Sequence, residues 1–259
     1  AAGDVRSTPF RQVVVAAGRG RVADVRAGDI DGDGDLDLTV ADFGLWQTGA
    51  IFLLRNHAAK GESPRFELET LDRRPGAIHV PACDLDQDGR LDIVTLISQE
   101  HESVQVLLNQ SDGRFSPHPL WTAPDLTFGS SGVELADLDQ DGDIDILYSN
   151  GDAFDNMFVN PSHGIQWLEN RGNLRFVYHR LTDLIGAYRA RVGDVDGDGD
   201  LDILAVAWLP EEVKPANVDT RNLPTILCLE QVRPGVFERH TLEVGAPHYV
   251  ALELADFDS

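Results

Sequence analysis

Short hydrophobic segments alternate with polar turns along the whole chain, and no segment shows helical periodicity. Some segments alternate apolar and polar residues, which is typical of half-buried β-strands. Others are continuous runs of Val, Ile and Leu, which is typical of buried strands. Four such strands follow one another in each of four consecutive periods. The pattern therefore predicts an all-β fold made of four-stranded antiparallel units.

Each period begins with an alternating strand, followed by an aspartate-rich loop and an apolar second strand. The third strand ends before a short polar turn, and the fourth strand follows that turn. The four first strands are VADVRAG from Val22, AIHVPAC from Ala77, GVELA from Gly132 and AYRARVG from Ala187. The fourth strands share a phenylalanine near their start, which we expect to pack between neighbouring units: Phe66, Phe115, Phe176 and Phe237.

The aspartate-rich loop has the frame D-x-D-x-D-G-x-x-D and occurs four times, about 55 residues apart. Repetition at a fixed period indicates a repeat architecture. A fifth copy begins as LADFDS at Leu254 and contains only Asp256 and Asp258 of the frame. Because it lacks the glycine and the last aspartate, we expect this copy to bind a cation weakly or not at all.

The frame suits calcium, which takes six to eight oxygen ligands. Positions 1, 3, 5 and 9 would supply carboxylates, position 7 a backbone carbonyl, and the glycine at position 6 a positive φ. A solvated acidic turn is the alternative, and Mg²⁺ is a weaker competitor because it keeps its waters. Positions 1, 3, 5, 7 and 9 are Asp29, Asp31, Asp33, Asp35 and Asp37; Asp84, Asp86, Asp88, Arg90 and Asp92; Asp137, Asp139, Asp141, Asp143 and Asp145; and Asp194, Asp196, Asp198, Asp200 and Asp202.

The residues around the loops separate the possible calcium families. An EF-hand needs a bidentate Glu at position 12 and flanking helices, whereas position 12 here is Val40, Thr95, Tyr148 or Ala205. Each loop also precedes a β-like run, which argues against EF-hand and dockerin modules. Thrombospondin type 3 arrays have denser motifs and cysteines. A period of about 55 residues with strands around each loop instead favours a propeller blade of four antiparallel strands.

Composition narrows the classes of partner. The chain has 259 residues, 42% of them hydrophobic, and a formal charge of −23. The charge argues against nucleic acid and anionic membranes as partners, and no apolar run is long enough to span a bilayer. No signal peptide is present in this chain, and the two cysteines leave the cellular compartment open.

The repeats resemble FG-GAP/VCBS repeats, the calcium-loop blades found in the integrin α-subunit head and in bacterial extracytoplasmic proteins. The resemblance extends from about Val22 to Ser259, and WLEN at Trp167–Asn170 favours the bacterial VCBS form. It implies a β-propeller with about four Ca²⁺ sites at the positions given above. It also implies a secreted, periplasmic or cell-envelope location. It says little about activity, because fold and function are only loosely tied.

We expect one propeller domain with four complete blades, at about 22–72, 77–121, 132–182 and 187–243. Part of a fifth blade would follow at 248–259, and residues 9–15 resemble an orphan outer strand. Because propellers close on four to eight blades, we expect the chain to belong to a larger ring of about seven. A small closed ring completed by the orphan strand is the alternative.

Function is expected on the face opposite the calcium loops, where long, irregular loops join second to third strands. Candidate ligand-binding residues there are Asp152, Asp155 and His163, although an ordinary polar loop is the alternative. His79 and Arg189, with Asp24 and Glu134, would line a central channel or form ion pairs between blades. The preferred function is a non-catalytic binding or scaffold module for a protein, a carbohydrate or other domains of the same protein. The rival is a carbohydrate-active lyase or dehydratase.

Overall fold

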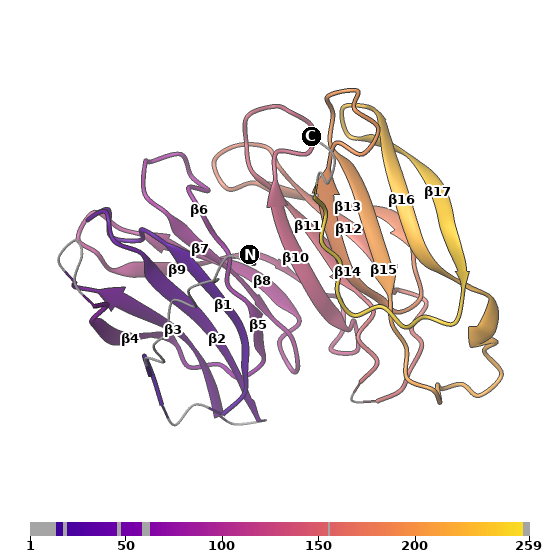
Figure 1. The fold of residues 1–259 in the computed structure, drawn as a ribbon, viewed down its shortest axis with the longest axis horizontal. Helices are drawn as coiled ribbons and strands as arrows, with labels where there is room; N and C mark the ends of the chain where they lie inside the picture. Colours follow the sequence, from indigo (N-terminus) through magenta and orange to yellow (C-terminus); the bar gives the residue numbers. More distant parts are fainter. Residues whose placement is uncertain (1–13, 18–19, 46–47, 59–62, 155, 256–259) are drawn as a thin grey trace, which may run out of the picture.

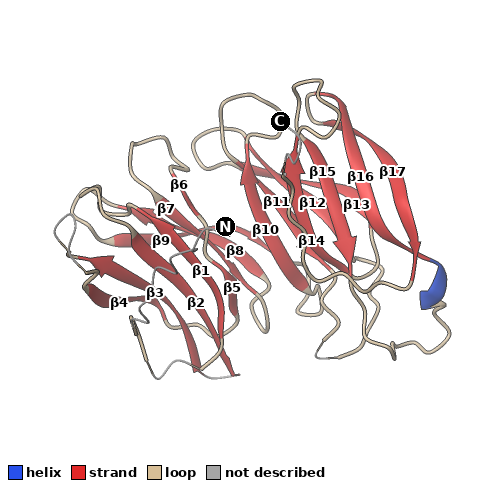
Figure 2. Cartoon of the chain, viewed as in Figure 1, coloured by secondary structure: helices blue, strands red, loops and turns tan. Residues whose placement is uncertain are grey.

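The computed structural model describes residues 14–17, 20–45, 48–58, 63–154 and 156–255. In these residues, strands form four antiparallel sheets, and the one helical element is the short 3₁₀ turn η1 (Thr220–Asn222). No described helix is long and apolar enough to cross a membrane. Figure 1 shows the sheets following one another in sequence order from indigo to yellow, and Figure 2 shows the same view with strands in red. The predicted all-β fold of four-stranded blades is confirmed.

The strands of each blade lie in sequence order, so that loops alternate between the two ends of the sheet. The strand bounds are β1 (Val22–Gly28), β2 (Asp37–Leu45), β3 (Thr48–Asn56) and β4 (Phe66–Asp72); β5 (Ala77–His79), β6 (Ala82–Cys83), β7 (Asp92–Ile97), β8 (Ser103–Asn109) and β9 (Phe115–Thr122); β10 (Ser130–Ala136), β11 (Asp145–Asn150), β12 (Gly164–Asn170) and β13 (Phe176–Asp183); and β14 (Ala187–Gly193), β15 (Asp202–Ala207), β16 (Leu223–Arg233) and β17 (Val236–Gly245).

The first strand of the second blade differs from the sequence prediction. AIHVPAC was expected to be one strand, but it is divided into β5 and β6, which both pair with β7. The interruption lies at Val80 and Pro81, because proline has no N–H to donate to the ladder. The Val80 N–H donates instead to Asp24 Oδ2 of the first blade, at 3.2 Å.

The core lies between the blades. One cluster joins the first and second blades, another the second and third, and the largest joins the third and fourth. Phe115, Phe176 and Phe237 each pack against the cluster that their blade shares with the preceding one. The expected position of these three phenylalanines is therefore confirmed, and burial between sheets is what holds the blades in order.

The two ends of the chain give less regular structure. Residues 9–13 of the predicted orphan strand lie outside the described residues, and Val14 and Val15 belong to no strand. Of the predicted fifth blade, residues 256–259 also lie outside the described residues. Residues 249–255 form no strand, and His248 makes an isolated antiparallel bridge with Trp208. A ring of about seven blades stays a prediction.

Candidate calcium loops and the opposite face

The four aspartate loops share one backbone geometry. The glycine at position 6 has φ of 93°, 90°, 96° and 97° in Gly34, Gly89, Gly142 and Gly199. In every loop the N–H of this glycine donates to an oxygen of the aspartate at position 1, at 2.9–3.1 Å. The predicted positive φ is therefore confirmed, and it curls the loop back onto its first carboxylate.

The aspartate at position 9 is the buried anchor of each loop. Asp37, Asp92, Asp145 and Asp202 are at most 1% exposed. One carboxylate oxygen accepts the N–H of the residue at loop position 2, and the other accepts the N–H of a residue at or near the end of the third strand. In Asp145 these distances are 3.0 Å from Leu138 and 2.7 Å from Asn170. Burial raises the pKa of Asp145 to about 7.

Carboxylate oxygens converge in all four loops. In each cluster, three oxygens from three residues lie within 4.8 Å of one another. In the second to fourth loops they come from positions 1, 3 and 9, whereas in the first loop they come from positions 1, 3 and 5. The clusters are Asp29, Asp31 and Asp33; Asp84, Asp86 and Asp92; Asp137, Asp139 and Asp145; and Asp194, Asp196 and Asp202.

The aspartates at position 5 also stabilise the loop itself, including Asp33, which belongs to the first cluster. At position 5, Asp33, Asp88, Asp141 and Asp198 each accept the N–H of position 7. At position 7, the Arg90 guanidinium contacts Asp88 and the carbonyl of Asn109. Its side chain therefore offers no ligand, as the prediction of a backbone-carbonyl donor at this position requires.

Three buried carboxylate oxygens in these loops have no hydrogen-bond partner: Asp29 Oδ1, Asp139 Oδ1 and Asp200 Oδ1. A buried, unpaired anionic oxygen is costly unless a cation or donor meets it. Three converging hard oxygen donors in a curled loop are the donor set that calcium prefers. The residues present therefore fit a calcium ion, which would be held by the carboxylates of each cluster.

Side-chain amides that sequence reasoning missed join neighbouring loops. Gln87, at position 4 of the second loop, donates to the Gly142 carbonyl at 3.0 Å and to Asp143 Oδ1 at 2.8 Å. Gln140 likewise donates to the Gly199 carbonyl of the fourth loop at 3.0 Å. Asn109 and Gln231, which lie at or near the ends of third strands, donate to the carbonyls of Ile30 and Leu138 in the preceding blade's loop, at 2.8 and 2.9 Å. The sequence signal for these contacts was the amide residue that recurs near the end of each third strand, in LRN, LLN, LEN and LEQ.

A family model described as FG-GAP-like repeat matches residues 84–148 and 150–205, where the second, third and fourth aspartate loops lie. These residues carry FG-GAP-like repeats. No curated protein gives a significant match to the sequence. The blade structure, the loop frame and the family match agree, and the FG-GAP repeats account for the acidic clusters as loops suited to calcium.

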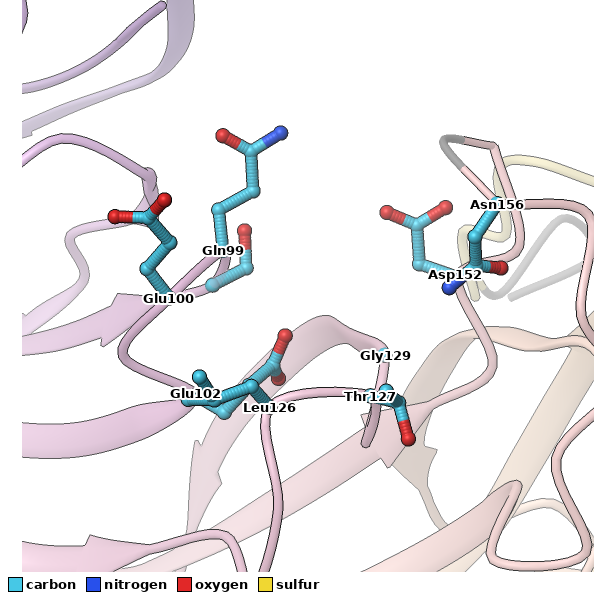
Figure 3. Close-up of a pocket in the computed structure, with 9 residues that line it drawn as sticks. Gln99, Glu100, Glu102, Leu126, Thr127, Gly129, Asp152 and Asn156 are labelled. Carbon is cyan, nitrogen blue, oxygen red and sulfur yellow. The ribbon is translucent and has the colours of Figure 1, made fainter. Parts of the chain in front are cut away.

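On the opposite face of the FG-GAP blades, a cavity of about 300 Å³ lies between the second and third blades. Figure 3 shows Gln99 and Glu100 on one side of it and Asp152 and Asn156 on the other. Three neighbouring residues in its wall have positive φ: Gln99 (40°), Glu100 (54°) and Glu102 (41°). The lining residues are Ser98, Gln99, Glu100, Glu102, Leu126, Thr127, Gly129, Asp152 and Asn156.

Glu102 is the buried acid of this cavity, with 4% of its surface exposed. Its Oε2 accepts the backbone N–H of Ser130 at 2.9 Å and also contacts the Ser130 hydroxyl. Burial raises the pKa of Glu102, and Asp152 and Asp125 add to the rise. A second hollow of about 360 Å³, lined by Phe158 and Pro161 among others, shares Thr127 and Asn156 with the first.

The predicted ligand-binding residues of this face are separated by the fold. Asp152 lines the cavity, and Asp155 lies outside the described residues. His163 is 2% exposed and is not among the lining residues; its Nδ1 accepts the Gly186 N–H at 3.3 Å. Burial lowers the pKa of His163 to about 4. His163 is therefore a neutral hydrogen-bond acceptor inside the third blade.

His79 and Arg189 meet on the first strands of the blades. Arg189 Nη1 lies 2.9 Å from His79 Nε2, and His79 Nδ1 lies 3.4 Å from Asp24 Oδ2. A guanidinium only donates, so Nε2 accepts from Arg189 and Nδ1 carries the proton. The Ser131 carbonyl, 3.3 Å from Nε2, receives no hydrogen bond from this neutral form of His79. Of the two sequence alternatives, ion pairing between blades is present, because Arg191 of β14 contacts Glu134 of β10. Arg26 contacts Asp24 within β1.

This network predicts acid sensitivity. Burial lowers the pKa of His79, so its stabilising effect is complete above pH 6.5 and is lost as the pH falls through the lower folded value. Burial opposes ionisation of Asp24, but the hydrogen bonds from His79 and Arg26 outweigh it and lower the pKa to about 2. That contribution is lost only below about pH 4.

In saturating calcium, we therefore expect the unfolding free energy to fall more between pH 7 and pH 5 in the wild type than in His79→Gln. Urea unfolding at both pH values measures the difference. His118→Gln, in the outer strand β9, is the control and should retain the wild-type slope. Equal slopes for wild type and His79→Gln would contradict the assignment of a neutral, buried His79.

Proposed function

We propose that the chain is a calcium-stabilised, extracytoplasmic propeller module that binds a protein or carbohydrate ligand on the face opposite its calcium loops. About four Ca²⁺ ions would be held, one in each complete blade. The observation that carries the proposal is the separation of the two ends of the blades. Converging carboxylates occupy one end, and the cavity between the second and third blades occupies the other.

Calcium accounts for the charge of the loops better than a solvated turn does. The clustered oxygens and the unpaired buried Oδ1 atoms of Asp29, Asp139 and Asp200 both require a positive charge nearby. Outside the cytoplasm, free calcium is high enough to fill sites of moderate affinity, with dissociation constants of about 10⁻⁴–10⁻³ M. This supports an extracytoplasmic location.

The chemistry of the opposite face favours binding over catalysis. Clustered His, Arg and Tyr side chains around one pocket would favour an enzyme, but the cavity between the second and third blades has none of these among its lining residues. His79 and Arg189 contact each other and Asp24 instead. The positive φ values of Gln99, Glu100 and Glu102 mark the kind of strained loop that is common at ligand sites.

An aromatic surface beside the cavity gives the ligand a stacking platform. Phe154 is 50% exposed and stacks on Trp208, with ring centroids 3.9 Å apart and planes at 12°. Tyr188 packs edge-on against Phe154 at 5.7 Å. Phe154 follows Asp152, which lines the cavity, by two residues. Exposed aromatic rings beside polar groups suit both sugar rings and peptide side chains.

A glycan array probed with the calcium-loaded chain tests the carbohydrate half of the proposal. A bound glycan should lose about tenfold in affinity in Phe154→Ala and in Glu102→Gln, because stacking and hydrogen bonding each contribute about 1–1.5 kcal/mol. Phe66→Ala, in the outer strand of the first blade, is the control and should bind normally. Absence of any retained glycan would exclude carbohydrate and leave a protein as the ligand.

A further inference from the structure

The residue at one position near the end of each third strand, beside the calcium loop, differs in charge between the first two blades and the last two. One residue at or near the end of every third strand donates its N–H to the aspartate at loop position 9. That shared hydrogen bond makes the preceding residues equivalent in the four blades. They are Arg55, Leu108, Glu169 and Glu230, and they carry one positive charge, none, and two negative charges in turn.

In the first blade this position places a cation on the loop. Arg55 Nη1 lies 3.7 Å from Asp31 Oδ2, at loop position 3, and only 16% of the Arg55 side chain is exposed. The same guanidinium is held by Glu69 and by the carbonyl of Gly113. A fixed positive charge beside a carboxylate of the cluster opposes the approach of a divalent cation.

In the third blade the equivalent position places an anion beside the loop. Glu169 is 2% exposed and is close enough to Asp139, again at loop position 3, for the two carboxylates to interact electrostatically. Both carboxylates line a cavity of about 480 Å³, and Asp139 Oδ1 is buried with no partner. Neighbouring carboxylates repel each other, and a cation bound at the loop would relieve that repulsion at Asp139.

The basic residues near Glu169 do not supply that charge to Asp139. Arg171 and His179 pair with Glu169 at 2.7 and 2.6 Å, and their side chains are 57% and 38% exposed. Neither forms an ion pair with Asp139 among the described residues. Arg171 and His179 therefore contact the Glu169 carboxylate from the solvent side. The side of Glu169 and Asp139 that faces the loop is left for a cation.

We propose that a charge at this strand position sets the calcium affinity of a loop when its side chain reaches loop position 3, so that the third loop binds calcium most tightly and the first least tightly. The proposal rests on the calcium function proposed above. Its physical basis is that affinity follows the number and sign of the charges around the ion. One unit charge beside a divalent ion at this range changes affinity by about tenfold.

The third loop carries its own reporter. Trp167 is 3% exposed, lies beside Asp145 and lines the same cavity as Asp139. Tb³⁺ binds where Ca²⁺ binds and emits when a nearby excited indole transfers energy to it. Titration of the calcium-free chain with Tb³⁺, excited through tryptophan, should therefore follow the third loop. Trp167→Phe should remove most of the signal, with the calcium stoichiometry unchanged in calorimetry.

Two substitutions test the ranking in opposite directions. Glu169→Gln should weaken the tryptophan-sensitised Tb³⁺ titration, and the tightest calcium step in calorimetry, by about tenfold. Arg55→Leu should strengthen the weakest calcium step by about tenfold and leave the Tb³⁺ titration unchanged. The matched controls are Glu230→Gln, which loses a surface pair with His240, and Arg65→Leu. Each control should change affinity less than twofold.

The outcomes separate this inference from the proposed function. A chain that binds neither Ca²⁺ nor Tb³⁺ would overturn the calcium function and the inference with it. A chain that binds both ions, with the tightest step unchanged in Glu169→Gln and the weakest unchanged in Arg55→Leu, would overturn the inference alone. Circular dichroism in excess calcium confirms that each variant is folded, so that a lost signal reports the site.

Discussion

Removing calcium with EGTA is expected to lower the melting temperature of the chain by about 20–40 °C. An ion present at about 100 times its dissociation constant stabilises the folded state by about 2.7 kcal/mol. Four such sites reach about 10 kcal/mol, comparable to the whole stability of a typical domain. Without the ions, the clustered aspartates repel one another and the buried Oδ1 atoms stay unpaired.

Differential scanning calorimetry in EGTA, and again after excess Ca²⁺ is restored, measures this effect. Mg²⁺ at the same concentration is the control and should restore much less, because it prefers to keep its waters. The shift should be reversible, since the ions bind to a fold that the inter-blade clusters already define. A melting temperature that is unchanged in EGTA would rule out a structural role for calcium.

Asp92→Asn is expected to destabilise the chain by about 3 kcal/mol. Asp92 is fully buried and accepts the N–H groups of Leu85 at 3.1 Å and Asn109 at 2.8 Å, one on each oxygen. Asparagine has one acceptor oxygen, so its amide group must face one of these two donors whichever way it turns. The substitution therefore breaks the link between the loop and the end of the third strand.

Urea unfolding of the variant measures the loss. Asp112→Asn, in an exposed turn paired with Arg114, is the control and should change stability by less than about 0.5 kcal/mol. The difference between Asp92→Asn and wild type should persist in EGTA, because the two backbone hydrogen bonds exist without the ion. A difference that vanishes in EGTA would show that Asp92 acts through calcium alone.

The blades could be predicted from the sequence because the strand patterns within each blade agree with the repeat that recurs along the whole chain. Alternating and continuous apolar runs, the glycine at loop position 6 and the phenylalanine near each fourth strand all belong to one repeat. The break between β5 and β6 could not be predicted from the sequence, because it depends on a hydrogen bond from the Val80 N–H to Asp24 of the neighbouring blade. Pro81 marked the break, but the alternating pattern around it favoured one continuous strand.

The loop chemistry was predictable in part. The aspartate frame names the residues that converge, but it does not distinguish the buried anchor at position 9 from the loop-stabilising role of position 5. That distinction depends on burial and on hydrogen bonds to a strand that follows the loop by many residues. The cavity could not be predicted from the sequence either, because the hydrogen bond from the Ser130 N–H to Glu102 forms only when the second and third blades pack together.

Gln87 and Gln140 link the calcium loops in one direction along the chain, from each loop to the next. Each side chain reaches forward from its own loop to the backbone of the next, so the second, third and fourth loops form one continuous belt. The first loop has Gly32 at this position and cannot extend the belt through a side chain. Disorder in one loop would therefore remove a hydrogen bond from the backbone of its neighbour, so we expect the conformations of the second, third and fourth loops to be coupled across the blade boundaries.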